Sequence, residues 1–293
     1  MTTTTNLDKV RETFNFSVDK FPLSGPENLS TPWYGLFRSD TGKPVGCGSV
    51  TDRYLPHQTD DVVALVEAAS EAFDDDIQIS CQFRNGHYVT CSPSRDYRKS
   101  IFGDKDNVFP RVIINAGYDG KSFNSIMGFY RDLCDNLSML KQIEETSVTI
   151  RHTSGLRSKM DDLIATFNVL KDSWATLSNV IAELQGREVQ MVEFLDAIYG
   201  QPDPDSKRGV TVHKNRTEAI FKRLQSERFR SNRPTMGSGF RVSSWEALNA
   251  IQGYVQHDAT RKKSSTTFDR MLLASRDQSV LKAQNLVLET LAA

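Results

Sequence analysis

The chain has 293 residues, of which 38% are hydrophobic and 25% charged, and its formal net charge is −1. This length and composition are typical of a soluble globular protein with one large domain or two modest ones. No stretch approaches the roughly 18 apolar residues of a membrane-spanning helix, and the first residues lack the basic and apolar regions of a secretory signal. We therefore expect no membrane partner and a cytoplasmic location.

The charge is distributed unevenly along the chain. The first 206 residues carry 20 basic and 30 acidic side chains, whereas the last 87 carry 16 basic and 7 acidic ones. The basic excess is densest between Lys207 and Arg241, where ten Lys or Arg face only Glu218 and Glu227. A local charge of this size attracts polyanions whatever the net charge of the whole molecule. The pattern favours nucleic acid as a partner.

The first half of the chain indicates an α+β fold. We assign residues 1–29 to a flexible N-terminal segment and residues 30–150 to an α+β domain with antiparallel β-hairpins. Alternating residues around Gly-containing turns predict the hairpins, and apolar residues at helical spacing predict the helices. The expected elements are a hairpin over Trp33–Val50 turning at Asp40-Thr41-Gly42, a helix over Asp60–Phe73, a hairpin joining 77–83 to 87–92 through Asn85-Gly86, a strand over Val112–Ile114 and a helix over Ser122–Leu140.

The second half, residues 151–293, is expected to be a helical domain that contains the basic segment 207–241. Nine apolar residues alternate at spacings of four and three, which predicts one long helix. They are Leu156, Met160, Leu163, Phe167, Leu170, Trp174, Leu177, Ile181 and Leu184. Gly186 is expected to end or interrupt this helix. Further helices are expected over Val189–Tyr199, Thr217–Arg228, Trp245–His257 and Ser279–Leu291.

The heptad pattern has two interpretations. The apolar seam is either the core-facing edge of an antiparallel helical bundle or the contact surface of a homo-oligomer. In the second case Phe167, Trp174 and Ile181 are the candidate seam residues. The polar residues beside the seam carry moderate charge, which distinguishes neither case.

A phosphate-binding loop is suggested by the segment from Val112 to Ser122. Such a P-loop consists of a strand, G-x-x-x-x-G-K-[ST] and a helix, so that backbone N–H groups surround the phosphates and the lysine reaches them. Lys121 and Ser122 match the end of the motif, but Asn115 replaces its first glycine. No carboxylate ends an apolar strand where Mg²⁺ would bind. A turn without nucleotide is the alternative interpretation.

Other catalytic or metal-binding patterns are missing from the sequence. The histidines His57, His87, His152, His213 and His257 are scattered, and neither C-x-x-C nor H-E-x-x-H occurs. We therefore expect no catalytic residue, no metal and no cofactor, and we expect the protein not to be an enzyme.

The basic segment is the remaining candidate site, because Lys and Arg neutralise phosphates and exposed aromatic rings stack on unpaired bases. The alternative is that the phenylalanines belong to the core and that the charges form a solvated face balancing the acidic N-terminal part. The candidate nucleic-acid-binding residues are Lys207, Arg208, Lys214, Arg216, Lys222, Arg223, Arg228, Arg230, Arg233, Arg241, Phe221 and Phe229.

Several separated blocks resemble the DUF932 family, a phage- and plasmid-associated domain of unknown function. The resemblance runs from about residue 30 to the end of the chain. The blocks are Tyr34–Gly42, Arg53-Tyr54, Asn115 with Tyr118-Asp119-Gly120, Arg131–Asn136, Trp245 with Asn249, Tyr254 and His257, and Phe268–Ser275. The resemblance implies an accessory protein of a mobile element in the cytoplasm of a bacterial host, often in the company of DNA repair and recombination functions. It attaches no firm activity to the fold.

The function expected from these observations is non-enzymatic binding of nucleic acid, most simply of single-stranded DNA during annealing, recombination or replication. Two alternatives stay open. One is a homo-oligomeric assembly protein that does not bind nucleic acid. The other is a P-loop-like nucleotide-binding protein that uses Lys121 and Ser122.

Overall fold

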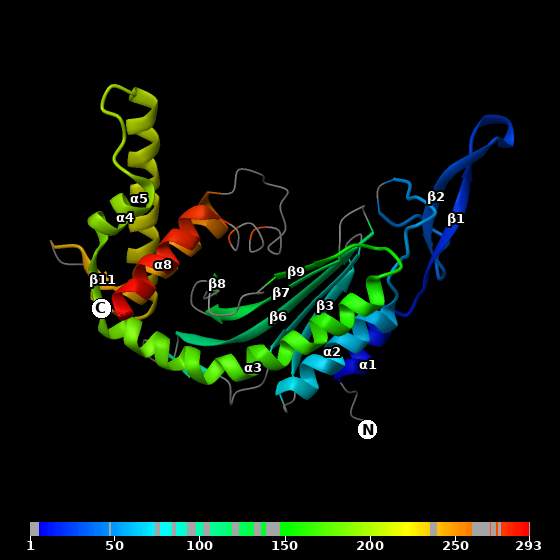
Figure 1. The fold of residues 1–293 in the computed structure, drawn as a ribbon, viewed down its shortest axis with the longest axis horizontal. Helices are drawn as coiled ribbons and strands as arrows, with labels where there is room; N and C mark the ends of the chain where they lie inside the picture. The colour runs from blue at the N-terminus through cyan, green and yellow to red at the C-terminus, as the bar shows by residue number, and fades with distance from the viewer. Residues whose placement is uncertain are drawn as a thin grey trace. The chain divides into compact units, whose positions relative to one another are not determined.

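The computed structural model shows an α+β protein whose chain divides into two compact units (Figure 1). Unit 1 comprises Met1–Tyr97, Pro110–Met127 and Glu145–Lys171, and unit 2 comprises Arg98–Phe109, Gly128–Glu144 and Asp172–Ala293. The expected fold class is confirmed, since antiparallel strands dominate the first half and helices the second. The structure describes residues 6–46, 48–73, 77–83, 86–92, 98–101, 106–118, 123–131, 136–138, 147–234, 239–259, 270, 274 and 277–292.

Unit 1 begins with a helix and a strand. The helix α1 (Asn6–Thr13) and the strand β1 (Val18–Ser24) both lie within the residues that the sequence assigned to a flexible segment. Val10 and Phe14 are completely buried, because α1 packs against α2 (Thr59–Phe73) and β3 (Gln78–Phe83). From residue 6 onward, the assignment of a flexible N-terminus is therefore corrected.

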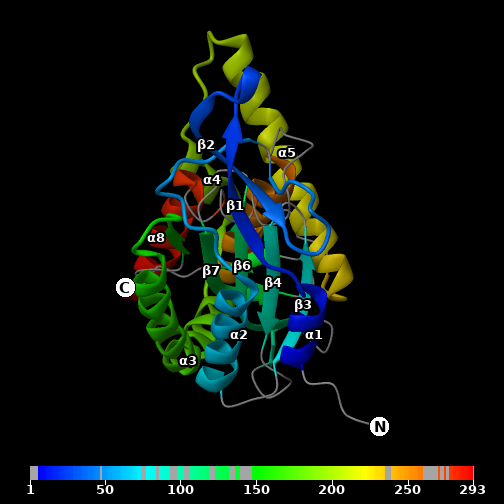
Figure 2. The same cartoon turned by 90° about the vertical axis from the view of Figure 1, so that its right-hand side faces the viewer.

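A long two-stranded ribbon follows α1. In it β1 pairs antiparallel with β2 (Ser30–Arg38), from Val18 opposite Arg38 to Ser24 opposite Ser30 (Figure 2). The turn expected at Asp40-Thr41-Gly42 is present, and Gly42 has the positive φ of 62° that such a turn favours. Among the described residues, the backbone of the expected return strand pairs with β2 through two isolated bridges, Phe37 with Pro44 and Tyr34 with Val50. The main partner of β2 is thus β1.

The sheet of unit 1 is antiparallel and carries α1 and α2, which run beside β3 and β4 (Figure 2). The second expected hairpin is confirmed, with Gln78 opposite Ser92. Gly86 faces Gly117 so closely that an added Cβ would lie 2.3 Å from the carbonyl oxygen of Ala116, which only glycine tolerates. The remaining strands are β4 (Gly86–Ser92), β6 (Asn107–Gly117), β7 (Phe123–Arg131) and β9 (Ser147–Ile150).

The helix expected over Ser122–Leu140 is wrong. The chain there forms β7, which pairs with β9 and with β8 (Asn136–Ser138). Phe129, Tyr130 and Arg131 are consecutive and all buried, so this strand lacks the alternation of apolar and polar residues that marks a half-exposed strand. Pairing with neighbouring strands overrides the local pattern.

The long heptad helix is confirmed as α3 (Leu156–Gly186), which ends at the expected glycine. The strands β6 and β7 and the helix α3 each pass from one unit into the other. After α3 the chain forms β10 (Glu188–Gln190) and α4 (Met191–Tyr199), where the side chain of Gln190 accepts a hydrogen bond from the N–H of Glu193 as an N-cap.

Unit 2 is built around a buried helix, α6 (Ser244–Gly253), in which every residue is buried. Ser243 and Glu246 form a capping box at its start, and α5 and α8 pack against it. The other elements of the unit are β5 (Lys99–Ser100), α5 (Lys207–Arg230), β11 (Arg241–Ser243), the π-helix η3 (Tyr254–Asp258) and α8 (Gln278–Ala292).

No helix in the described part of the chain combines the length and hydrophobicity needed to cross a bilayer.

Candidate nucleic-acid interface

Residues 207–230 of the basic segment form one helix, α5, which is longer than the sequence predicted. It begins at Lys207 rather than Thr217, because the side chain of Ser206 caps it by accepting a hydrogen bond from the N–H of Gly209 (3.1 Å). The cap offsets the poor helix propensity of Gly209 and of the β-branched residues that follow it. The buried face of α5 carries Ile220, Leu224, Glu227 and Arg228.

The opposite face of α5 is exposed and basic. Lys207, Lys214, Lys222 and Phe229 follow one another at spacings of seven, eight and seven residues, which places them in one row along the helix. At 1.5 Å per residue this row is about 33 Å long. Arg208 and Arg230 are also exposed beside the row. Lys214 lies 3.9 Å from Glu218, and both side chains are largely exposed, so this pair is weak.

Phe229 is the most exposed of the large hydrophobic side chains that the structure describes, with 82% of its surface accessible. Phe221, the other aromatic candidate, is half-buried and packs edge-to-face against Phe240 at 5.2 Å between ring centroids. Of the two expected stacking residues, only Phe229 therefore presents a free ring face. Exposing such a ring costs free energy that a partner would recover.

The five remaining candidate cations differ in their exposure and in the side chains that they contact. Arg241, on β11, is exposed. Arg216 lies over the ring of Tyr199, 4.3 Å from its centroid. The other three, Arg223, Arg228 and Arg233, contact carboxylates within unit 2. These three are not part of the exposed basic surface.

Arg228 and Arg233 both pair with one buried acid, Glu246. Arg228 donates through Nε at 2.7 Å and through Nη2 at 3.1 Å, and Nη1 of Arg233 contacts the same carboxylate. Burial alone would raise the pKa of Glu246, but the hydrogen bonds from Arg228 and the charge of Arg233 outweigh it and hold this pKa below its usual value. These arginines stabilise the fold of unit 2 by compensating a buried charge.

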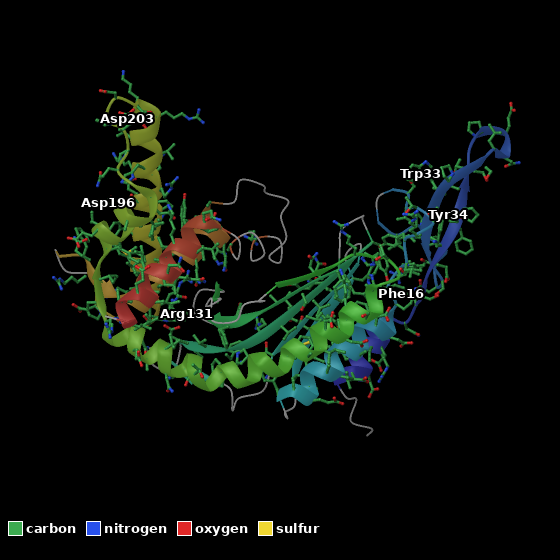
Figure 3. All side chains as sticks on the ribbon, viewed as in Figure 1. Phe16, Trp33, Tyr34, Arg131, Asp196 and Asp203 are labelled. Atoms are coloured by element: carbon green, nitrogen blue, oxygen red, sulfur yellow. The ribbon has the colours of Figure 1, made fainter. Side chains whose placement is uncertain are left out.

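A second buried charge cluster surrounds Arg131, which Figure 3 labels. Its Nε and Nη2 donate to the two carboxylate oxygens of Asp106 at 2.8 and 2.7 Å, and its Nη1 donates to Oε2 of Glu227 at 2.7 Å. The Arg131 side chain is 2% exposed. This bidentate geometry is the strongest form of an arginine–carboxylate contact. Glu227, one of only two acids in the basic segment, thereby compensates a buried arginine.

Three histidines that are far apart in the sequence, His57, His87 and His152, lie together in the core of unit 1. No pattern in the sequence indicates this cluster. Nε2 of His57 lies 2.9 Å from Nδ1 of His87, and the ring of His152 lies 5.1 Å from that of His57. Tyr118 stacks on His57 at 4.2 Å, and its hydroxyl donates to the carbonyl oxygen of His57. Thr59 donates to the carbonyl oxygen of Phe14 and lies 3.4 Å from Nε2 of His87.

These contacts assign one proton to each imidazole. Nε2–H of His57 donates to Nδ1 of His87, and Nε2–H of His87 points to the hydroxyl oxygen of Thr59. Nδ1 of His57 has no hydrogen-bond partner in the described part of the chain, so a second proton there would be buried without an acceptor. Burial lowers the pKa of His87 to about 3, helped by the charge of Arg38. Burial, together with the neighbouring His87 and His152, also lowers the pKa of His57 well below its ordinary value. The described residues contain no group of metal-ligating side chains placed to hold an ion.

The P-loop interpretation loses its structural basis. Lys121 and Ser122 lie outside the described residues, but the next element is the strand β7. A P-loop requires a helix there, because the N–H groups of its first turn bind the phosphates.

The oligomer-seam interpretation of α3 also loses its basis. Phe167 and Ile181 are completely buried within a single chain, and Trp174 stacks on Phe129 at 5.4 Å. A residue that forms a contact between copies must be accessible in the single chain, so the interpretation as a core-facing edge accounts for Phe167 and Ile181. Trp174 is half-buried and has its stacking partner, Phe129, within the same chain.

A comparison with protein families shows which family the chain belongs to. The model of the family described as "Domain of unknown function (DUF932)" matches residues 47–282, which is most of the chain. The chain belongs to the DUF932 family. No curated protein and no solved structure matches it. The resemblance noted in the sequence is confirmed, although the block at Tyr34–Gly42 precedes the matched residues.

Four of the residues that carried the DUF932 resemblance have structural roles. Tyr118 packs on the histidine cluster, Arg131 compensates two buried acids, and Trp245 is fully buried in α6. Asn249 donates to the carbonyl oxygen of Trp245. In this DUF932 chain the exposed face of α5 is a separate feature, which none of these blocks includes.

Proposed function

We propose that this DUF932 protein binds single-stranded DNA with little sequence preference, through the exposed face of α5. The observation that carries the proposal is the position of Phe229, an aromatic ring exposed at the end of a row of lysines. The lysines supply phosphate contacts, and an exposed ring stacks on unpaired bases of any identity. Duplex bases are already stacked, so the ring favours single strands. We further propose a non-enzymatic role in annealing, recombination or replication for a phage or plasmid.

The number of exposed cations sets the expected salt dependence. Six of the ten candidate cations are exposed: Lys207, Arg208, Lys214, Lys222, Arg230 and Arg241. If each neutralises one phosphate, the slope of log affinity against log salt concentration is about −4 on single strands. We expect fluorescence anisotropy with a labelled oligothymidylate to give this slope.

The triple variant Lys207→Gln, Arg208→Gln, Lys222→Gln tests whether α5 makes these contacts. Removing three contacts should reduce the slope to about −2. A charge-matched control replaces three exposed lysines of unit 1, Lys9, Lys43 and Lys159, with glutamine, and should leave the slope unchanged. A wild-type slope near zero, or equal effects of the two triple variants, would contradict the proposal.

Phe229→Ala is expected to weaken binding of single-stranded DNA by a factor of about 5 to 150, which corresponds to about 1–3 kcal/mol for one stacked base. The salt slope should not change, because the substitution removes no charge. Val210→Ala, at another exposed apolar position of α5, is the control and should bind like the wild type. Equal affinities of Phe229→Ala and the wild type in the same anisotropy titration would show that the ring does not stack on DNA.

A further inference from the structure

A pocket of about 350 Å³ lies within unit 2, between the exposed face of α5 and Asp258 of the π-helix η3. Its volume is at the small end of the roughly 300–1,000 Å³ of ligand pockets and suits a group the size of a nucleotide. Most of its lining comes from the last three turns of α5, the part of the helix that also carries Phe229.

Three hydrogen-bond donors on α5 line this pocket at regular spacing. Lys222, Ser226 and Arg230 are four residues apart, which places the ammonium, the hydroxyl and the guanidinium one above another on the same face of the helix. All three residues are exposed. Phosphate oxygens only accept hydrogen bonds, and charged donors bind them most strongly.

Two carboxylates, Asp258 and Glu227, also line the pocket, and both are already compensated. Asp258 accepts from Nε of Arg223 at 2.8 Å. Glu227 accepts from the buried Arg131 at 2.7 Å and lies 4.0 Å from Nη1 of Arg223. Lys222, by contrast, contacts no carboxylate among the residues that the structure describes. The pocket therefore presents an excess of positive charge to an incoming group.

We propose that this pocket binds a phosphate group of the nucleic-acid strand, with Lys222, Ser226 and Arg230 as donors, while a neighbouring base stacks on Phe229. The inference rests on the proposed function and specifies which part of the strand α5 recognises. The ion pairs behind the pocket fix Arg223 and Glu227, so its wall is formed before the ligand arrives.

The test measures the affinity of oligothymidylates carrying a label at the 3′ end, with either a 5′-hydroxyl or a 5′-phosphate. Ser226→Ala removes one donor without changing the charge, so we expect about a fivefold loss of affinity with an unchanged salt slope. The double variant Lys222→Gln, Ser226→Ala should lose more. Thr211→Ala removes an exposed hydroxyl of α5 outside the pocket and should bind like the wild type.

The two oligonucleotides distinguish the source of the phosphate. Weaker binding of both by Ser226→Ala identifies an internal phosphodiester, and weaker binding of the 5′-phosphorylated one alone identifies a terminal phosphate. Binding of both oligonucleotides by Ser226→Ala at wild-type affinity would overturn the pocket proposal and leave intact the proposed function, which does not depend on Ser226. Absence of binding by the wild type would instead overturn the proposed function itself.

Discussion

Arg131→Met is expected to lower the free energy of unfolding by about 3–5 kcal/mol, the usual cost of removing one partner from a buried ion pair. The substitution leaves the carboxylates of Asp106 and Glu227 buried without their three charged hydrogen bonds. Urea denaturation followed by circular dichroism measures the change. Arg131→Lys should recover only part of it, because an ammonium group does not reproduce the planar fork that contacts both oxygens of Asp106.

Arg11→Met is the matched control for this prediction. Arg11 also pairs with a carboxylate, that of Glu67 at 3.0 Å, but about half of each side chain is exposed. Such a pair contributes less than about 1 kcal/mol. In addition, the triple variant Arg131→Met, Asp106→Asn, Glu227→Gln should be more stable than Arg131→Met alone, because it removes the uncompensated charges. A loss below about 1 kcal/mol for Arg131→Met would show that this pair does not stabilise the fold.

Acidification from pH 7 to pH 5 is expected to destabilise the protein through the histidine cluster of unit 1. The pKa of His87 in the folded chain, about 3, lies below its ordinary value of 6.5, so the unfolded chain binds a proton that the folded chain does not. The stabilisation is therefore complete above pH 6.5 and is lost as the pH falls from there toward 3. At about 1.4 kcal/mol per pH unit, His87 accounts for about 2 kcal/mol at pH 5. The lowered pKa of His57 acts in the same direction.

His87→Gln tests the origin of this effect. The variant is less stable than the wild type at pH 7, but between pH 7 and pH 5 it should lose about 2 kcal/mol less, because one titrating group is gone. Phe83→Leu is the control, since Phe83 packs edge-to-face against His87 at 5.6 Å and does not titrate. It should lower stability at both pH values and keep the full acid-dependent loss. If His87→Gln retained the wild-type loss, protonation of His87 would not be its cause.

The elements that the sequence predicted correctly are those with a strong local pattern. The heptad of α3, the apolar face of α2 and the hairpin of β3 with β4 each depend on residues close together in the chain. The helix predicted over Ser122–Leu140 was wrong because β7 forms by pairing with β8 and β9, and its own residues lack the alternation that marks a strand. The same holds for α1, because the elements that bury it, α2 and β3, begin 46 and 65 residues after its end at Thr13.

In the candidate site, too, the sequence predicted the local features and missed the contacts between residues far apart in the chain. The sequence located the basic helix and both phenylalanines, because charge and aromatic residues are concentrated within one short segment. It did not show which cations are available, since Arg228 and Arg223 pair with acids 18 and 35 residues away. It also gave no sign of the histidine cluster, where 30 residues separate His57, in the loop before α2, from His87 on β4.

The β1–β2 ribbon carries a proline in each strand, Pro22 and Pro32, and proline has no N–H to donate to a neighbouring strand. Strand prolines lie where the missing N–H would face solvent, so each interrupts an outer edge of the ribbon. The missing donor disfavours backbone pairing with another molecule at that point of the edge, which is one way in which strands avoid edge-to-edge aggregation. The ribbon also exposes large side chains such as Trp33, which is labelled in Figure 3, and these offer another molecule a contact that does not depend on backbone pairing.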